Sequence, residues 1–185
     1  MTLANRITMA RIGIIPAFAG LAWYYGYSTY HPPAMEWARV GAAVTFGLAA
    51  ATDAVDGYVA RHFNQRTELG ALLDPIADKG LILTAILVLS SWELGLPLWF
   101  AILVISRDVG LGLGCLLINA KRGHVNVRPS WCGKAATVFQ LIAIAWLLLG
   151  IPVGLSIWVL GATALILWSA FEYLADGLRQ LREGD

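Results

Sequence analysis

Apolar residues in this chain occur in long runs that are separated by short charged segments. Each run is about twenty residues long, which is the length an α-helix needs to cross roughly 30 Å of hydrocarbon. The runs predict six transmembrane helices, near residues 8–28, 36–60, 75–92, 97–119, 132–150 and 154–175. No linker or low-complexity tract interrupts them, so we expect one all-α membrane domain over residues 1–185.

The composition supports this interpretation. Of 185 residues, 58% are hydrophobic and only 14% are charged, and the net charge is +1. A soluble enzyme and a nucleic-acid-binding module are therefore excluded as classes. We expect an integral membrane protein surrounded by membrane lipids, in a bacterial inner membrane or its equivalent.

Basic residues are distributed unequally between the predicted connections. The segments 27–35, 91–96 and 150–153 contain no Lys or Arg, whereas the other connections and both ends of the chain contain many. The positive-inside tendency places these basic segments, and both termini, in the cytoplasm. Aromatic residues near the other ends of the helices are interpreted as interfacial anchors: Trp23, Tyr24, Tyr25, Tyr27, Tyr30, Trp37, Trp92 and Trp99.

Four aspartates lie near the cytoplasmic ends of the second and third predicted helices: Asp53, Asp56, Asp74 and Asp78. An ionised carboxylate at membrane depth costs about 2.5 to 3.5 kcal/mol, so four of them need a positive partner. The spacings of three and four residues place each pair on one face of its helix. Carboxylates without nearby His or Cys favour Mg²⁺ or Mn²⁺, and the number of acids suggests two ions.

The acids allow two other interpretations. A structural salt-bridge cluster could use Arg61 and Arg66 of the same loop, but two arginines would leave two negative charges unpaired. A cation or proton transporter would need polar groups along a path through the bilayer. The acids cluster at one end instead, and the outer half of the predicted bundle is nearly uncharged apart from Arg39.

The acids belong to a longer pattern, Asp53-x-x-Asp56-Gly57-x-x-Ala60-Arg61, eight residues, then Gly70-x-x-x-Asp74-x-x-x-Asp78. This pattern resembles the signature of the CDP-alcohol phosphotransferases at every fixed position. An early Asn5-x-x-Thr8-x-x-Arg11 and a late Gly133-Lys134 extend the resemblance over most of the chain. The resemblance implies that family's fold of six transmembrane helices.

The resemblance also implies a reaction in phospholipid biosynthesis. A phosphatidyl group would pass from CDP-diacylglycerol to an alcohol, with release of CMP and with Asp78 as general base as well as metal ligand. The implied CDP-lipid site consists of Asn5, Thr8, Asp56, Gly57, Ala60, Arg61, Thr67 and Gly70. For Asn5 and Thr8, helix capping is an alternative role.

The acceptor alcohol should bind among the remaining polar groups at membrane depth. We expect Arg107, Arg128, Ser130 and Lys134 to form a cationic pocket for a phosphate on an acidic, glycerol-containing acceptor. Lys134, Thr137 and Gln140 recur every three residues, which also fits a structural polar seam between helices. Neighbouring helical residues point apart, so we expect Arg107 and Asp108 to need partners other than each other.

Two acceptors fit this chemistry. The run Ser106-Arg107-Asp108 resembles the CMP-forming cardiolipin synthases, which use phosphatidylglycerol, more than the phosphatidylglycerophosphate synthases, which use glycerol-3-phosphate and usually have Glu after that Arg. The sequence therefore favours cardiolipin synthesis, with phosphatidylglycerophosphate synthesis as the alternative and the phosphatidylinositol-phosphate branch more distant. Gly110 and Gly114 form a small-xxx-small pair that would allow close packing within one subunit or in a homodimer.

Overall fold

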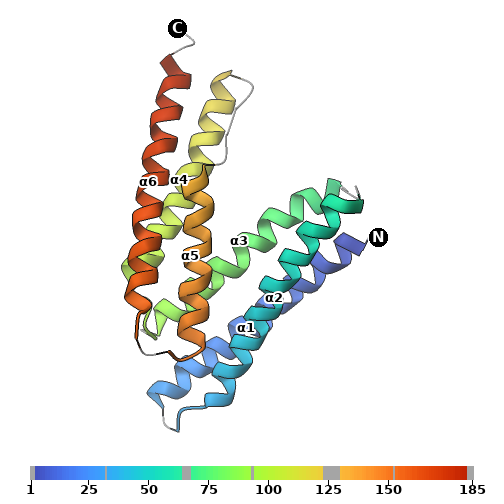
Figure 1. Ribbon diagram of the computed structural model, residues 1–185, viewed down its shortest axis with the longest axis vertical. Coiled ribbons are helices and arrows are strands. Elements are labelled where there is room, and N and C mark those ends of the chain that lie inside the picture. Colours follow the sequence, from blue (N-terminus) through green and yellow to red (C-terminus); the bar gives the residue numbers. More distant parts are fainter. Residues whose placement is uncertain are drawn as a thin grey trace. The chain divides into compact units, whose positions relative to one another are not determined.

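The computed structural model describes residues 3–31, 33–63, 68–92, 94–122, 130–151 and 153–182. Within them, only the backbone is described for residues 3–8, 10, 53–63, 68–78, 115, 117–122 and 178–182. The described residues form six α-helices and no strand (Figure 1). The helices are α1 Leu3–Tyr30, α2 Glu36–Phe63, α3 Glu68–Ser91, α4 Leu98–Arg122, α5 Trp131–Leu148 and α6 Leu155–Arg182.

The prediction of an all-helical chain is confirmed, and so is the order of the helices. The largest differences lie at the polar ends, because α3 begins at Glu68 instead of residue 75 and α6 continues to Arg182 instead of residue 175. Apolar runs mark only the part of a helix that needs hydrocarbon around it. Backbone hydrogen bonding within the helix continues through polar residues as well.

Two helices in the described part are long and apolar enough to cross a membrane. They are α5 over Trp131–Leu148 and α6 over Leu155–Gly177, and a shorter apolar helical stretch covers Lys79–Ser91. Large apolar side chains on α6 are exposed, including Ile157, Leu160 and Phe171. Such a surface is expected for a helix that faces lipid. Six spans and a cytoplasmic orientation of the termini stay predictions.

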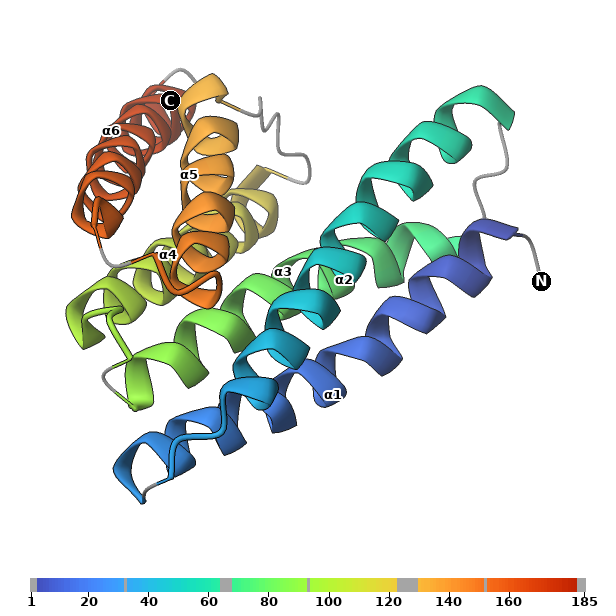
Figure 2. The same ribbon diagram turned by 60° about the horizontal axis from the view of Figure 1, so that its bottom comes forward.

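The chain divides into two compact units, of which the first is Met1–Leu96 together with Ile144–Pro152. In this unit α1 lies along both α2 and α3 (Figure 2). Small side chains such as Ala22, Ala38 and Ala42 are fully buried and let the helices approach closely. Phe18 of α1 and Phe46 of α2 fill the space between them, with ring centroids 5.6 Å apart.

Several predicted interfacial aromatics pack on one another at one end of this unit. The ring of Trp92 lies near those of Trp23, Tyr27 and Tyr30, at centroid distances of 5.0, 6.3 and 5.8 Å. Trp23, Tyr27 and Tyr30 are about half exposed, so each ring is both packed and open to its surroundings. Amphipathic rings of this kind suit a membrane-water interface.

Gly26 of α1 allows Trp92 to pack against the helix, because a Cβ at Gly26 would overlap the Trp92 side chain. We expect Gly26→Ala to destabilise the protein by about 1 to 3 kcal/mol through overpacking. Gly20→Ala is the matched control in the same helix, since a Cβ at Gly20 meets no described atom within 4 Å. Thermal unfolding in detergent measures both variants, and equal unfolding temperatures would show that the Trp92 contact is not needed.

Arg39 has a structural role near the start of α2, where the chain carries few charges. Its Nε donates to Glu36 at 2.7 Å, and its Nη1 donates to the backbone oxygen of Leu148 at 3.1 Å. Leu148 is the last residue of α5, where a cation interacts favourably with the helix dipole. Gly150 follows with φ +70°, and a Cβ there would overlap the Arg39 guanidinium.

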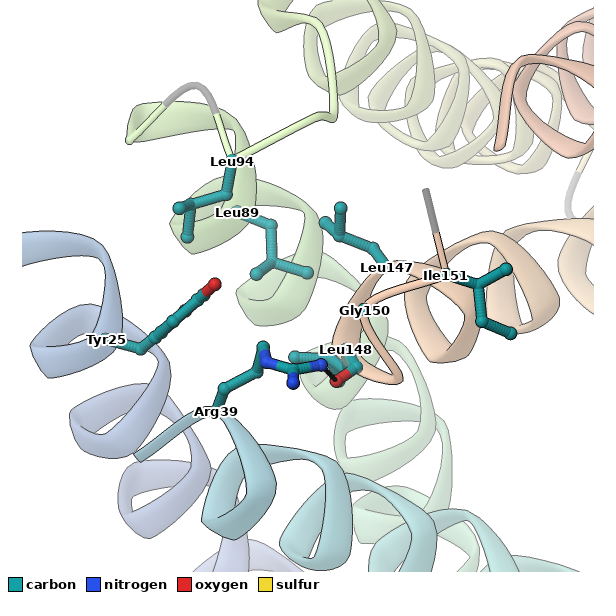
Figure 3. A pocket seen from close by; sticks show the side chains of 8 residues that line it. All are labelled: Tyr25, Arg39, Leu89, Leu94, Leu147, Leu148, Gly150 and Ile151. Carbon is teal, nitrogen blue, oxygen red and sulfur yellow. Dashed lines mark hydrogen bonds between the residues drawn. The ribbon is translucent and has the colours of Figure 1, made fainter. Parts of the chain in front are cut away.

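A cavity of about 210 Å³ lies beside this contact, lined by Leu89, Leu147 and other apolar residues (Figure 3).

The second unit is Pro97–Ala143 together with Val153–Asp185. In it α4 packs against α6, and the end of α5 that belongs to this unit also contacts α6. Phe139 of α5 lies so close to Gly161 of α6 that a Cβ there would overlap its ring. In contrast, a Cβ at Gly110 or Gly114 would meet no described atom within 4 Å. The small-xxx-small pair therefore makes no close helix contact within the described part of the chain, and the homodimer stays a prediction.

Candidate functional site

The acid motif is carried by two helices of the first unit. Asp53 and Asp56 belong to α2, in its second half, and Asp74 and Asp78 belong to α3, in its first half. The end of α2, the start of α3 and the start of α1 lie at the same end of this unit (Figures 1 and 2). The backbone thus carries both halves of the motif, and the early Asn5 and Thr8, towards one end of three neighbouring helices.

The spacing of the motif residues along α2 and α3 places them on shared helix faces, as the predicted site requires. On α2, Gly57 and Ala60 follow Asp53 by four and seven residues, so they share its face. On α3, Gly70, Asp74 and Asp78 are four residues apart and form a second such row.

The acid and CDP-lipid side chains lie outside the described residues. The helix backbone is described at Asn5, Thr8, Arg61 and the acid positions, whereas Thr67 and Arg128 lie wholly outside the described residues. Among described side chains, no group of three His, Cys, Asp or Glu is close enough to hold a metal. The four-aspartate metal site therefore stays a prediction.

Arg11 of α1 is a described side chain of the early motif. It is 1% exposed and is the largest of the fully buried side chains in the described part. A buried guanidinium needs acceptor oxygens around it. The two helices that α1 contacts carry the predicted acids, so a buried cation on α1 is consistent with an acidic site nearby.

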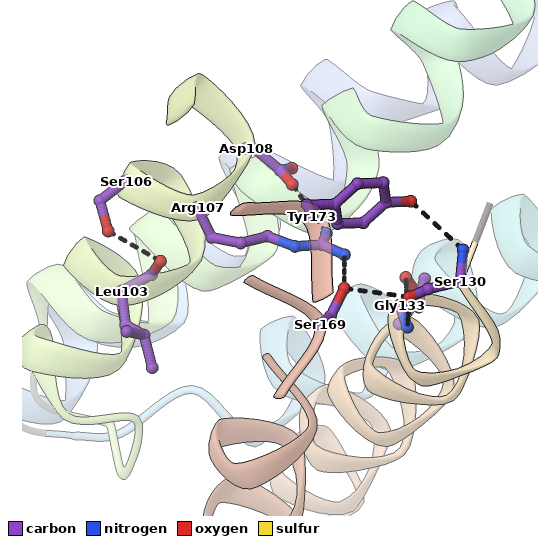
Figure 4. Close-up of polar contacts among 9 residues, drawn as sticks. Leu103, Ser106, Arg107, Asp108, Ser130, Gly133, Ser169 and Tyr173 are labelled. Carbon is purple, nitrogen blue, oxygen red and sulfur yellow. Dashed lines mark hydrogen bonds and ion pairs between the residues drawn. The ribbon is translucent and has the colours of Figure 1, made fainter. Parts of the chain in front are cut away.

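A polar network in the second unit joins two of the predicted acceptor residues (Figure 4). Arg107 of α4 donates from Nη2 to the hydroxyl of Ser169 on α6, at 3.3 Å. The hydroxyl of Ser169 lies 3.2 Å from that of Ser130, at the start of α5. The structure therefore brings Arg107 and Ser130 together through a residue of a third helix.

Ser130 begins α5 as its N-cap residue. Its hydroxyl accepts the backbone N–H of Gly133 at 3.0 Å, and its own backbone N–H donates to the Tyr173 hydroxyl at 3.3 Å. Gly133 leaves room for these side chains, because a Cβ would lie 2.9 Å from Nη2 of Arg107 and 3.2 Å from the Ser169 hydroxyl. The late Gly133 of the motif therefore makes room for the network.

Arg107 and Asp108 contact each other, although adjacent positions on a helix were expected to need other partners. Nη1 of Arg107 lies 2.9 Å from Oδ1 of Asp108. Their Cβ atoms point apart, but the arginine side chain is long enough to turn back along the helix. The additional partner expected for Arg107 is present as Ser169.

The predicted stripe on α5 is divided between three environments. Lys134 is exposed, and its ammonium lies over the ring of Trp131 at 5.3 Å from the centroid. Thr137 donates to the backbone oxygen of Gly133, and Gln140 is buried. Lys134 therefore does not join the Arg107 network in the described contacts.

Sequence reasoning missed Ser169 and Tyr173 of α6, which complete this network. They are four residues apart and share a helix face with the network. The polar run around Glu172 and Tyr173 in an apolar helix was the available signal. Glu172 itself accepts from Trp168 at 2.9 Å.

Comparison with known proteins identifies the family. A family model described as CDP-alcohol phosphatidyltransferase matches residues 1–171. The CDP-diacylglycerol–glycerol-3-phosphate 3-phosphatidyltransferase of Bacillus subtilis (strain 168) is 35% identical over 97% of both chains. A probable phosphatidylglycerophosphate synthase of Mycobacterium tuberculosis is 37% identical over 97% of this chain and 83% of that protein.

A further relative supports the same assignment. The CDP-diacylglycerol–glycerol-3-phosphate 3-phosphatidyltransferase of Escherichia coli (strain K12) is 34% identical over 91% of both chains. The resemblance seen in the aspartate motif is thus confirmed over nearly the whole length. The chain belongs to the CDP-alcohol phosphatidyltransferase family.

Proposed function

We propose that this protein transfers the phosphatidyl group of CDP-diacylglycerol to glycerol-3-phosphate, giving phosphatidylglycerophosphate and CMP. The observation that carries the proposal is the similarity, over 97% of both chains, to a relative whose name specifies this donor and this acceptor. The comparisons thus favour the alternative acceptor over the phosphatidylglycerol that the sequence favoured.

The proposed chemistry is an in-line displacement at phosphorus. The acceptor hydroxyl oxygen forms a bond to the phosphatidyl phosphorus, the bond from that phosphorus to the bridging diphosphate oxygen breaks, and CMP leaves. Asp78 accepts the hydroxyl proton. Arg61, in the register of the CDP-lipid motif, pairs with the diphosphate.

The donor set of the acid motif suits a hard divalent cation. We propose that Asp53, Asp56, Asp74 and Asp78 hold Mg²⁺ or Mn²⁺, because oxygen ligands without His or Cys select such ions. A bound cation would neutralise the diphosphate and the charge that develops on departing CMP.

The second unit offers chemistry for the acceptor phosphate. Arg107 is a cation with a side chain 13% exposed, and Ser130 supplies a hydroxyl that is linked to it through Ser169. Glycerol-3-phosphate is close to a dianion at neutral pH and gains from charge-assisted hydrogen bonds with an arginine.

One assay tests the proposal against its competitors. Purified protein receives CDP-diacylglycerol, Mg²⁺ and one acceptor at a time: glycerol-3-phosphate, phosphatidylglycerol, or an inositol phosphate. Released CMP is measured, and the lipid product is identified by mass. We expect phosphatidylglycerophosphate from glycerol-3-phosphate. Efficient cardiolipin formation with no phosphatidylglycerophosphate would overturn the proposed acceptor but leave the reaction class intact.

A further inference from the structure

We infer that Ser169 of α6 is a positioning residue for the acceptor: it holds the guanidinium of Arg107 and the hydroxyl of Ser130 in the orientation that binds the phosphate of glycerol-3-phosphate. The inference rests on the proposed function and adds to it a residue outside the aspartate motif. Three helices of the second unit contribute, since Arg107 is on α4, Ser130 precedes α5 and Ser169 is on α6 (Figure 4).

The direction of the hydrogen bonds follows from which atoms can donate. Arg107 can only donate, so the Ser169 oxygen is the acceptor of its Nη2–H group. Ser169 is 0% exposed, and a buried hydroxyl without an acceptor is costly. Its own O–H therefore donates to Ser130, the hydroxyl that lies 3.2 Å away.

Because Ser169 donates to Ser130, the hydroxyl hydrogen of Ser130 is available to a bound ligand. The Ser130 oxygen already accepts from Ser169 and from the backbone N–H of Gly133. Ser130 is only partly buried, so its O–H can turn to an incoming acceptor atom. In the described part of the chain, Nε of Arg107 also has no hydrogen-bond partner.

The network thus has more donors than acceptors, which is the composition expected for an oxyanion site. Oxygen atoms of a phosphate accept from arginine and hydroxyl donors in this way. The first N–H groups of α5, which begins at Trp131, add the positive end of a helix dipole at the same place. Asp108 pairs with Arg107 at 2.9 Å, so an acceptor phosphate has to compete with this carboxylate for the guanidinium.

Ser169→Ala tests the inference, because it removes the hydroxyl with little change in volume. We expect the KM for glycerol-3-phosphate to rise about tenfold, with kcat and the KM for CDP-diacylglycerol within about twofold of wild type. Inorganic phosphate, used as a competitive inhibitor, should lose affinity by the same factor. A purely structural role of Ser169 would not separate phosphate affinity from the other constants.

Thr163→Ala is the matched control on the same helix, since its hydroxyl donates to the backbone oxygen of Val159 at 2.8 Å. Thr163→Ala should leave kcat, the KM values for both substrates and the affinity for inorganic phosphate unchanged. Gly133→Ala is a second test, because its Cβ would displace Nη2 of Arg107 from Ser169, and we expect the same selective rise in KM. Unfolding temperatures of all variants show whether each one folds.

The outcomes separate the two proposals. An unchanged KM and phosphate affinity in Ser169→Ala, or equal losses for both substrates, would overturn the role of Ser169 while wild-type activity upholds the proposed function. Absence of any phosphatidylglycerophosphate from the wild-type protein would overturn both.

Discussion

Asp78→Asn abolishes phosphatidyl transfer, with an expected loss of at least about a thousandfold in kcat. The asparagine amide cannot accept the proton of the attacking hydroxyl, although it keeps the size of the side chain and one oxygen that can contact a cation. CDP-diacylglycerol should still bind in the presence of Mg²⁺, because three carboxylates of the motif are unchanged. The measurements are CMP release and equilibrium binding of the CDP-lipid.

Asp176→Asn is the control for this experiment, because Asp176 is an exposed carboxylate on α6. It should retain wild-type turnover. Turnover of Asp78→Asn within tenfold of wild type would show that another group accepts the proton. Loss of CDP-lipid binding together with turnover would assign Asp78 to metal binding instead.

The helices could be predicted from the sequence because apolar runs of membrane length have few alternative interpretations. The ends of the helices could not be predicted, since a helix continues through polar residues such as Glu68 wherever its backbone hydrogen bonds are satisfied. In the sequence, Arg39 was conspicuous only as a basic residue in a part of the chain with few charges. Its contact with the backbone oxygen of Leu148 joins residues far apart in the chain, and no local pattern reveals such a contact.

The aspartate motif of the first unit and the Arg107 network of the second differ in how far sequence could predict them. Four aspartates in apolar helices are conspicuous because each is costly at membrane depth. Ser169 and Tyr173 are not conspicuous, since hydroxyl groups in membrane helices often bond to their own backbone, as Thr163 does. Their role is visible only when α6 is placed beside α4 and the start of α5.

The sequence-based choice of acceptor used the run around Arg107 and Asp108 together with Arg128-Pro129-Ser130 and Gly133-Lys134, and the difference from phosphatidylglycerophosphate synthases was Asp108. The sequence interpretation treated this residue as a sign of cardiolipin synthesis, whereas relatives similar over nearly the whole chain are named for glycerol-3-phosphate. The structure pairs Asp108 with the adjacent Arg107, and its side chain is 16% exposed. Either Asp or Glu can orient a neighbouring arginine. The length of the acidic side chain at position 108 therefore does not distinguish between acceptor substrates.

Arg107→Gln should raise the KM for glycerol-3-phosphate about a hundredfold, since a charge-assisted hydrogen bond to phosphate is lost. Glutamine carries no charge, and its amide ends where Nε of arginine lies, so it does not replace the bond from Nη2 to Ser169. Arg107→Lys should recover only part of the affinity, because an ammonium lacks the two arms that reach Asp108 and Ser169 together. Steady-state kinetics with each substrate varied in turn measures the effect.

Arg39→Gln is the control for loss of an arginine that pairs with a nearby carboxylate. Arg39 bonds to Glu36 and to the end of α5, so its loss should lower the unfolding temperature and leave the KM for glycerol-3-phosphate unchanged. A rise in that KM equal to the one for Arg107→Gln would mean that general destabilisation, and not phosphate binding, controls acceptor affinity.

A double variant separates phosphate binding from the pairing of Arg107 with Asp108. Arg107→Gln weakens the stabilisation of the Asp108 carboxylate, which alone could disturb the site. Arg107→Gln combined with Asp108→Asn removes both charges, so the unfolding temperature should recover towards wild type. The KM for glycerol-3-phosphate should stay high, because the cation that the phosphate needs is still missing. Recovery of the KM in the double variant would instead show that Arg107 serves only to neutralise Asp108.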